Sequence, residues 1–252
     1  MDYTIRRVQK SGLRHYEISQ NGEIIGVFPS ITTILGETGD KGGLNKWIQR
    51  VGEAEAKRIS ELSMNRGTIM HRLIELYKPI PIVDKLQKLE ELKKIAATDK
   101  EVNQFQENEN GELWLEEGWK MFMKFFMNSS GFFDRVEEVL SAEEFLWSKL
   151  GYAGTVDNVS RVDGNKVMII DYKNSRKPKR EEWIQDYYLQ GSAYFIAYWE
   201  RYGIKPEGVE IWIANEIDSI PQKFVLSASD VKYYFAEFMK RLKKFKELQD
   251  EI

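Results

Sequence analysis

The chain of 252 residues has no cysteine and only two histidines, His15 and His71. The absence of cysteine excludes a disulfide framework, a thiolate zinc site, a cysteine-ligated iron–sulfur cluster and a cysteine nucleophile. Because only two imidazoles are available, a bound metal would be held mostly by carboxylate oxygens. Such ligands favour hard ions, Mg²⁺ or Mn²⁺, over zinc.

Long hydrophobic runs and a strong charge of one sign are also absent. No stretch reaches the roughly 18 consecutive apolar residues that a membrane span needs, and the first seven residues lack the apolar core of a signal peptide. The net charge of −3, from 37 basic and 40 acidic residues, argues against a nonspecific polyanion binder but is compatible with a local basic groove. We therefore expect a soluble intracellular protein without a membrane partner, in the cytoplasm or nucleoid, or in the host cytoplasm if viral.

The first 130 residues predict short strands followed by helices. Residues 3–28 alternate apolar and polar positions around Gly12 and the Asn21-Gly22 turn signal, which is typical of two or three antiparallel strands. Helical patterns follow at 30–35 with an end at Gly36, from 42–43 onward, at 53–77 with an interruption at Arg66-Gly67, at 84–96 and at 112–128. The polar stretch 97–111 predicts a mobile connector within this helical insertion.

The remaining residues, 131–252, predict the core of an α/β fold. Strands are expected at 137–147, 153–161, 166–173, 209–216 and around 223–226. A helix is expected over 180–201, and a final helix should begin after a Ser229 cap. We expect one domain over 1–252 with a mixed central β-sheet flanked by helices, extended by an N-terminal β-hairpin and helical additions.

Two aspartates and a lysine are predicted to meet at a hairpin. If Asp163-Gly164-Asn165 is a three-residue loop with one left-handed residue, pairing is centred on Gly164, and Asp157 lies opposite Asp171. Lys173, two residues farther along the strand, points to the same face as Asp171. A two-residue turn would instead place the aspartates on opposite faces.

Another segment with the same Asp-x-Lys pattern does not lie on a predicted strand. Asp230-Val231-Lys232 falls in a helical pattern, where residues i and i+2 do not face each other. A surface ion pair on a hairpin is the simpler alternative for Asp171 and Lys173. The stretch 36–43 resembles a phosphate-binding loop, but its Lys41 is one position early and no Ser or Thr follows, so no nucleotide cofactor is expected.

Four motifs occur in a characteristic order along the chain. They are Gly67-Thr68-Ile69-Met70-His71, Gly154-Thr155-Val156-Asp157, Asp171-Tyr172-Lys173 and Gln190-Gly191-Ser192-Ala193-Tyr194. In this combination the sequence resembles the RecB-type branch of the PD-(D/E)XK nuclease superfamily, particularly members similar to the mitochondrial genome maintenance exonuclease and phage exonucleases. The resemblance covers most of the chain, except 84–128, and implies a restriction-endonuclease-like core.

The resemblance also implies roles for these residues. His71, Asp157 and Asp171 would bind Mg²⁺ or Mn²⁺, and Lys173 would be the catalytic lysine. Asp157, Asp171, Gln190 and Tyr194 would complete the catalytic set. An acidic residue on the preceding strand is either Glu143 or Glu144, and the sequence leaves both open. An iron–sulfur cluster, present in some family members, is not expected.

A basic run follows the D-x-K strand. Arg176, Lys177, Lys179 and Arg180 would contact phosphates beside the active site, or would simply form a solvated loop. As the resemblance implies, we expect a metal-dependent DNA nuclease that acts as an exonuclease on single-stranded ends. The alternatives are a structure-selective endonuclease on the same site and a non-catalytic DNA-binding protein with the same fold.

Overall fold

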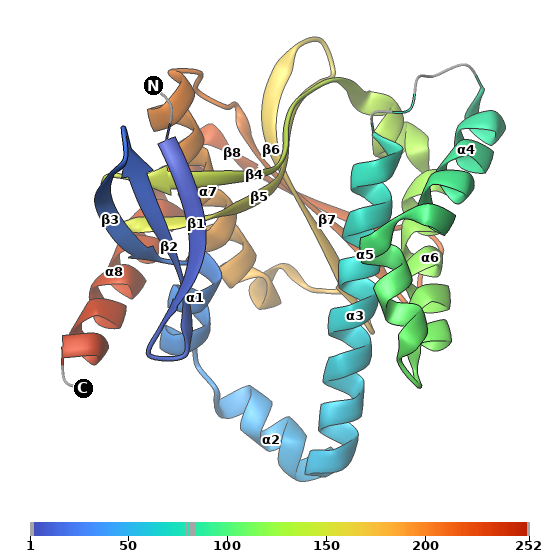
Figure 1. The fold of residues 1–252 in the computed structure, drawn as a ribbon, viewed down its shortest axis with the longest axis horizontal. Coiled ribbons are helices and arrows are strands. Elements are labelled where there is room, and N and C mark those ends of the chain that lie inside the picture. Colours follow the sequence, from blue (N-terminus) through green and yellow to red (C-terminus); the bar gives the residue numbers. More distant parts are fainter. Residues whose placement is uncertain (1–2, 79, 81–83, 251–252) are drawn as a thin grey trace.

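A mixed five-stranded sheet forms the centre of the structure, a computed structural model that describes residues 3–78, 80 and 84–250 (Figure 1). Its order is β4-β5-β6-β7-β8, and only β6 and β7 pair in parallel. The strands are β4 (Val136–Ser148), β5 (Tyr152–Val162), β6 (Lys166–Ser175), β7 (Gly208–Asn215) and β8 (Gln222–Ser227). The predicted α/β class with a mixed central sheet is confirmed.

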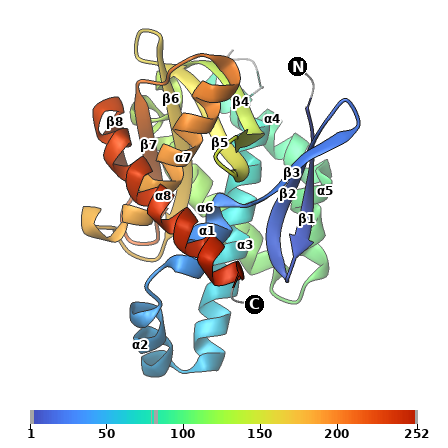
Figure 2. The ribbon, with the colours of Figure 1, turned by 90° about the vertical axis from the view of Figure 1, so that its left-hand side faces the viewer.

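Helices cover both faces of this sheet because side chains alternate along each strand. Along β6, Ile169 packs in the core on one face and Ile170 in the core on the other. The first core is covered by α1 (Ile31–Thr38), α7 (Gln185–Tyr202) and α8 (Ala228–Asp250) (Figure 2). The second is covered by α3 (Glu53–Tyr77), α4 (Lys85–Thr98) and α6 (Gly111–Met127). Among the described residues, no helix is both long enough and apolar enough to cross a membrane.

The N-terminal residues form a separate antiparallel sheet of three strands. These are β1 (Tyr3–Lys10), β2 (Leu13–Gln20) and β3 (Glu23–Pro29). Asn21 and Gly22 have φ of 53° and 84°, as the turn signal predicts for a two-residue hairpin. Ser30 bridges to Ala153 of β5, so this small sheet is held against the central one.

Two predicted helix breaks are wrong. α3 continues through Arg66-Gly67, where the glycine permits a close contact, since a Cβ on Gly67 would lie 2.5 Å from Asn174 Nδ2. α1 likewise continues through Gly36 to Thr38, because a single glycine costs a helix only about 1 kcal/mol. Ser30 caps the start of this helix, since its hydroxyl accepts the Thr33 N–H at 3.0 Å.

Other expectations need correction at their boundaries. The expected mobile connector contains α5 (Lys100–Asn103) and a 3₁₀ turn (Gln104–Glu107), because the Asp99 carboxylate caps α5 and pairs with Arg72. The helix expected from residue 180 begins at Gln185, after a 3₁₀ turn at Glu181–Trp183. Ser227, not Ser229, accepts the Asp230 N–H at the start of α8. α2 (Gly42–Val51) begins where predicted, has no buried residue and projects from the body (Figure 2).

Candidate active site

Strands β5 and β6 of the central sheet stop pairing and diverge at Asp157 and Asp171, a point that we call the fork. The β5–β6 ladder runs from Val162↔Lys166 to Asn158↔Ile170, which is centred on Gly164 as predicted. The three loop residues all have positive φ, 45°, 80° and 81°, whereas only one left-handed residue was expected. Beyond the last pair, β5 remains with β4 and β6 with β7, so the strands diverge (Figure 1). Asp157 and Asp171 are the first residues beyond that pair, where backbone groups are free to contact side chains.

The two aspartates and Lys173 lie together at this fork. Asp157 Oδ2 accepts the Tyr172 N–H at 2.8 Å. Lys173 Nζ lies 2.5 Å from Asp171 Oδ2, yet neither oxygen of this fully buried carboxylate accepts a hydrogen bond of normal geometry. The geometric prediction from the hairpin is therefore confirmed, and the pair is buried rather than a surface ion pair.

Burial and the charges of neighbouring groups both shift the pKa values of Asp171 and Lys173. Burial raises the pKa of Asp171 to about 6, and the Asp157 carboxylate adds to the effect while Lys173 opposes it. Burial lowers the pKa of Lys173, but the carboxylates of Asp171 and Asp157 outweigh it, and the net shift is upward. Lys173 is therefore held as an ammonium beside an under-satisfied carboxylate.

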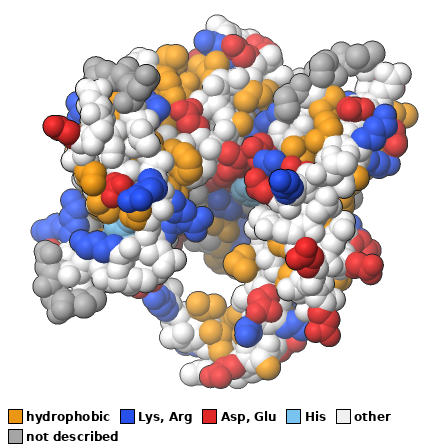
Figure 3. All heavy atoms as spheres, in the orientation of Figure 1, with side chains coloured by type: hydrophobic (Ala, Val, Ile, Leu, Met, Phe, Trp, Pro, Cys, Tyr) orange, Lys and Arg blue, Asp and Glu red, His pale blue; other side chains and the backbone are white. Residues whose placement is uncertain are grey.

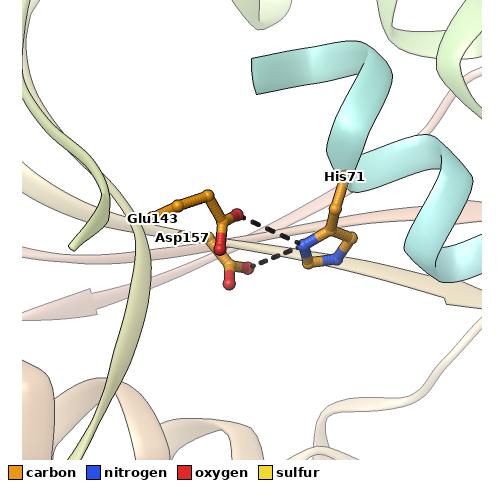
Figure 4. Close-up of side chains that lie close together, drawn as sticks. All are labelled: His71, Glu143 and Asp157. Carbon is orange, nitrogen blue, oxygen red and sulfur yellow. Dashed lines mark ion pairs between the residues drawn. The ribbon is translucent and has the colours of Figure 1, made fainter. Parts of the chain in front are cut away.

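His71 reaches the fork from α3 (Figure 4). Its Nε2–H donates to the Tyr172 carbonyl at 2.8 Å, which leaves Nδ1 as the ligand nitrogen. Nδ1 lies 3.6 Å from Asp157 Oδ2 and 3.9 Å from Glu143 Oε1. Burial lowers the pKa of His71, but Asp157 and Glu143 outweigh burial and raise it.

The choice between the two glutamates on β4 is decided by the backbone. Glu143 has φ of +47°, and its side chain turns toward His71 and Asp157. Glu144 instead accepts the Tyr202 hydroxyl and lies 3.6 Å from Arg201. A positive φ at a non-glycine residue leaves no mark in the sequence, so sequence reasoning could not separate these neighbours.

The donor set fits a divalent metal. Ligand atoms of His71, Glu143 and Asp157 all lie within 4.8 Å of one another, and in the described part of the chain no second such group is found. Asp171 lies beside this group, and its two buried oxygens lack hydrogen-bond partners. The Lys173 ammonium pairs with one of these oxygens, and the remaining carboxylate oxygens of the group suit a hard ion.

Gln190 and Tyr194 come from α7 and face the same fork. Both line a cavity of about 260 Å³ together with Asp157 and Lys173. A Cβ on Gly154 would lie 2.8 Å from Tyr194 Oη, so the glycine of the G-T-x-D motif makes room for this tyrosine. The structure therefore brings together the motifs of β5, β6, α3 and α7.

A buried clamp holds α3 against the end of β6. Arg66, 1% exposed, donates through Nε to Asn174 Oδ1 at 2.6 Å and through Nη1 to Glu216 Oε1. Asn174 Oδ1 also accepts the Ser63 hydroxyl at 3.3 Å. Because His71 follows on the same helix, this clamp fixes its position relative to Asp171 and Lys173.

The predicted basic run lies apart from this cavity. Arg176, Lys177 and Arg180 are exposed, and the Lys179 N–H donates to Gln222 Oε1 at 2.6 Å. Of the described residues that line the two cavities at the fork, none belongs to this set of four.

Three arginines that the sequence did not single out lie closer to His71 and Glu143 than this basic run does. Arg7 and Arg14 from the N-terminal sheet and Arg72 from α3 line a groove of about 680 Å³ that also contains His71 and Glu143. Figure 3 shows this face hollowed between the N-terminal sheet and the α3 side. No local signal marks Arg7 and Arg14, because their place at the groove depends on how the small sheet docks, and Arg72 is paired there with Glu75 and Asp99.

Comparison with known proteins agrees with this geometry. A family model for the PD-(D/E)XK nuclease superfamily matches residues 46–251, and no curated protein matches the chain. Among solved structures, a candidate exonuclease from Eubacterium rectale is 9% identical, with a TM-score of 0.40 over 75% of this chain and 84% of that one. The protein SSO0001 is 15% identical, with a TM-score of 0.29 over 73% and 86%. Because the family match spans most of the sequence, the chain belongs to the PD-(D/E)XK nuclease superfamily, whose members hydrolyse nucleic acids with divalent metal ions.

Proposed function

We propose that this protein is a Mg²⁺- or Mn²⁺-dependent deoxyribonuclease that acts as an exonuclease on single-stranded DNA ends. The observation that carries the chemistry is the convergence of Asp157, Asp171 and Lys173 at the fork, with His71 beside them. We further propose that residues 1–252 form one nuclease domain, in which 131–252 supply the catalytic core and 1–130 supply His71 and the groove.

Four side chains would hold the metal. They are His71, Asp157 and Asp171, as the sequence resemblance implies, together with Glu143. The metal, when bound, would lower the pKa of a water molecule and stabilise charge on the attacking and leaving oxygens of the phosphodiester. His71 would bind through Nδ1, since Nε2 is engaged with the Tyr172 carbonyl.

The ammonium of Lys173 would act directly on the reacting groups. Its Nζ is held beside Asp171 at 2.5 Å and lines the cavity at the fork, so it can orient the attacking water or stabilise charge in the transition state. Gln190 and Tyr194 line the same cavity and would position the scissile phosphate or the Lys173 side chain through hydrogen bonds.

The groove supports a single-stranded substrate. Arg7 and Arg14 would neutralise phosphates, whereas Arg72 is already paired with Glu75 and Asp99. Phe145, 40% exposed on the same groove, offers a face on which an unpaired base can stack. Figure 3 also shows an opening between α2 and the rest of the molecule, through which a strand with a free end could pass. Arg176, Lys177, Lys179 and Arg180 would contact the strand beyond the cavity.

A time course on end-labelled linear and circular single-stranded DNA tests the proposal, with Mg²⁺, with Mn²⁺ and with EDTA. We expect linear DNA to be degraded from its ends only when metal is present, and circular DNA to resist. Cleavage of the circle would instead indicate an endonuclease, and binding without cleavage would indicate a non-catalytic protein. Matched RNA strands test the choice of nucleic acid.

Substitutions at the fork test which residues are needed for cleavage. Asp171→Ala and Lys173→Ala should abolish cleavage while folding and most DNA binding persist. The chain offers its own control, since Asp230→Ala and Lys232→Ala alter the same D-x-K letters on α8, where both side chains are exposed. Full activity in either Asp171→Ala or Lys173→Ala would remove the proposed site.

A further inference from the structure

A second cavity, of about 320 Å³, lies behind the metal site and has no role in the proposed hydrolysis. It lies between the end of α3, the start of α4 and β4. The residues of its lining on which the proposal depends are Tyr77, Lys78, Lys88, Phe133 and Tyr172. The Tyr172 ring separates it from the metal site: the His71 ring meets this ring edge-on at 6.0 Å, and Lys78 Nζ lies 4.9 Å from its centroid. Lys78 follows His71 by seven residues, about 10 Å along the helix.

Two lysines point into this cavity without a counterion. Among the residues that the structure describes, the ammonium group of neither Lys78 nor Lys88 forms an ion pair or a hydrogen bond, although both nitrogens lie over aromatic rings. Lys88 is only 8% exposed, and its Nζ lies 4.0 Å from the centroid of the Tyr77 ring. Buried lysines are rare unless they are paired, so the buried Lys88 together with the half-buried Lys78 in one cavity indicates a missing anion.

The carboxylates at the rim are already engaged. Glu137 accepts the N–H groups of Gly164 at 2.6 Å and Asn165 at 3.1 Å. Glu138 accepts the Arg161 Nε–H at 2.8 Å. These acidic groups hold the β5–β6 loop and β5. The Arg161 guanidinium offsets the charge of Glu138, whereas Glu137 keeps its charge but forms no ion pair with either lysine in the described part of the chain.

The pKa values of the lysines agree with this geometry. Burial lowers the pKa of Lys78 to about 8, against the opposing attraction of more distant carboxylates such as Asp157. Burial also lowers the pKa of Lys88, with Asp134 opposing. A bound anion would offset the cost that burial imposes on both ammonium groups.

We propose that this cavity is a second ligand site that takes a phosphomonoester carried on a nucleoside, either a free nucleoside monophosphate or the terminal phosphate of a strand. Two ammonium groups match the charge of a phosphomonoester dianion, and lysine is a frequent phosphate ligand. The volume falls in the range of small-molecule sites and exceeds what a phosphate group alone would fill. The choice of a nucleotide as the carrier rests on the proposed nuclease function, whereas the anion site itself does not.

Calorimetric titration of the full chain in EDTA tests the site, with deoxyadenosine 5′-monophosphate, deoxyadenosine and inorganic phosphate as probes. EDTA removes the metal from the fork, and the Lys78 and Lys88 variants distinguish binding in the second cavity from binding in the arginine groove. We expect the monophosphate to bind more tightly than either fragment, and Lys78→Gln and Lys88→Gln each to weaken it at least tenfold. Lys85→Gln is the matched control one turn earlier on α4, because Lys85 donates to Ser129 and does not line the cavity.

Thermal melting of each variant separates a folding defect from a binding defect. Because the half-buried Lys78 ammonium has no ion pair with a described residue, Lys78→Met should melt no lower than the wild-type chain and still lose binding. Absence of monophosphate binding by the wild-type chain, or equal binding in the Lys78 and Lys88 variants, would overturn the proposal.

The source of the phosphate follows from cleavage assays on strands with a 5′-phosphate, a 3′-phosphate or hydroxyl ends. Faster degradation of one phosphorylated strand, lost in Lys78→Gln, identifies a strand terminus as the ligand. Equal rates on all strands, with inhibition by the free monophosphate, identify the mononucleotide. Binding with no nuclease activity would refute the proposed function alone, and activity without binding would refute the second site alone.

Discussion

The contact between Gly154 and Tyr194 allows a sharp test of how the site is assembled. A Cβ on Gly154 would lie 2.8 Å from Tyr194 Oη and 2.9 Å from Cε1, against the 3.4 Å at which ordinary contact begins. The ring must therefore move about 0.6 Å away from its position between Gly154 and the cavity at the fork. Overpacking of this kind costs about 1–3 kcal/mol, so Gly154→Ala should be destabilised by that amount and should lose activity.

A double-mutant cycle isolates the contact. In a Tyr194→Leu background the obstructing ring is gone, so Gly154→Ala should cost far less, with a coupling energy of about 1–2 kcal/mol. The free energy of unfolding is measured by urea titration, monitored by the fluorescence of the seven tryptophans. Gly36→Ala is the control, because this helical glycine has no heavy atom within 4 Å and alanine should stabilise α1 by up to about 1 kcal/mol. An equal cost of Gly154→Ala in both backgrounds would show that the reasoning about this contact is wrong.

Two further predictions follow from single side chains. Glu143→Gln should raise the Mg²⁺ concentration needed for half-maximal cleavage by about tenfold or more, whereas Glu144→Gln should not, because only Glu143 faces His71; identical metal titrations would contradict this. Hydrogen bonds from Arg72 hold the pKa of Asp99 below its usual range, so the stability that this carboxylate contributes is present above pH 3.8 and is lost as the pH falls through its lower folded value. Asp99→Asn should therefore cost about 1 kcal/mol at pH 7 and progressively less toward pH 3, as urea titrations across this range would show.

Local patterns were enough to predict the hairpin that carries the aspartates. The register of β5 and β6 depends on the loop at 163–165 and on the period of two along a strand, both of which are properties of a few adjacent residues. The order of strands and helices after residue 131 followed from apolar periodicity in the same way. Glycines were less informative, because Gly67 and Gly36 were interpreted as helix breaks although both lie inside helices.

The sequence by itself determined the α/β class, the hairpin register and the placement of Asp157, Asp171 and Lys173 on one face, because each depends on short-range backbone geometry. Only the tertiary structure decided that Glu143 turns toward His71, and that Arg66 clamps α3 to Asn174, 108 residues away. Such contacts depend on how separate elements pack, and the residues involved carry no signal within their own segments. The arginine groove and the lysine cavity arise in the same way, where surfaces from distant parts of the chain meet.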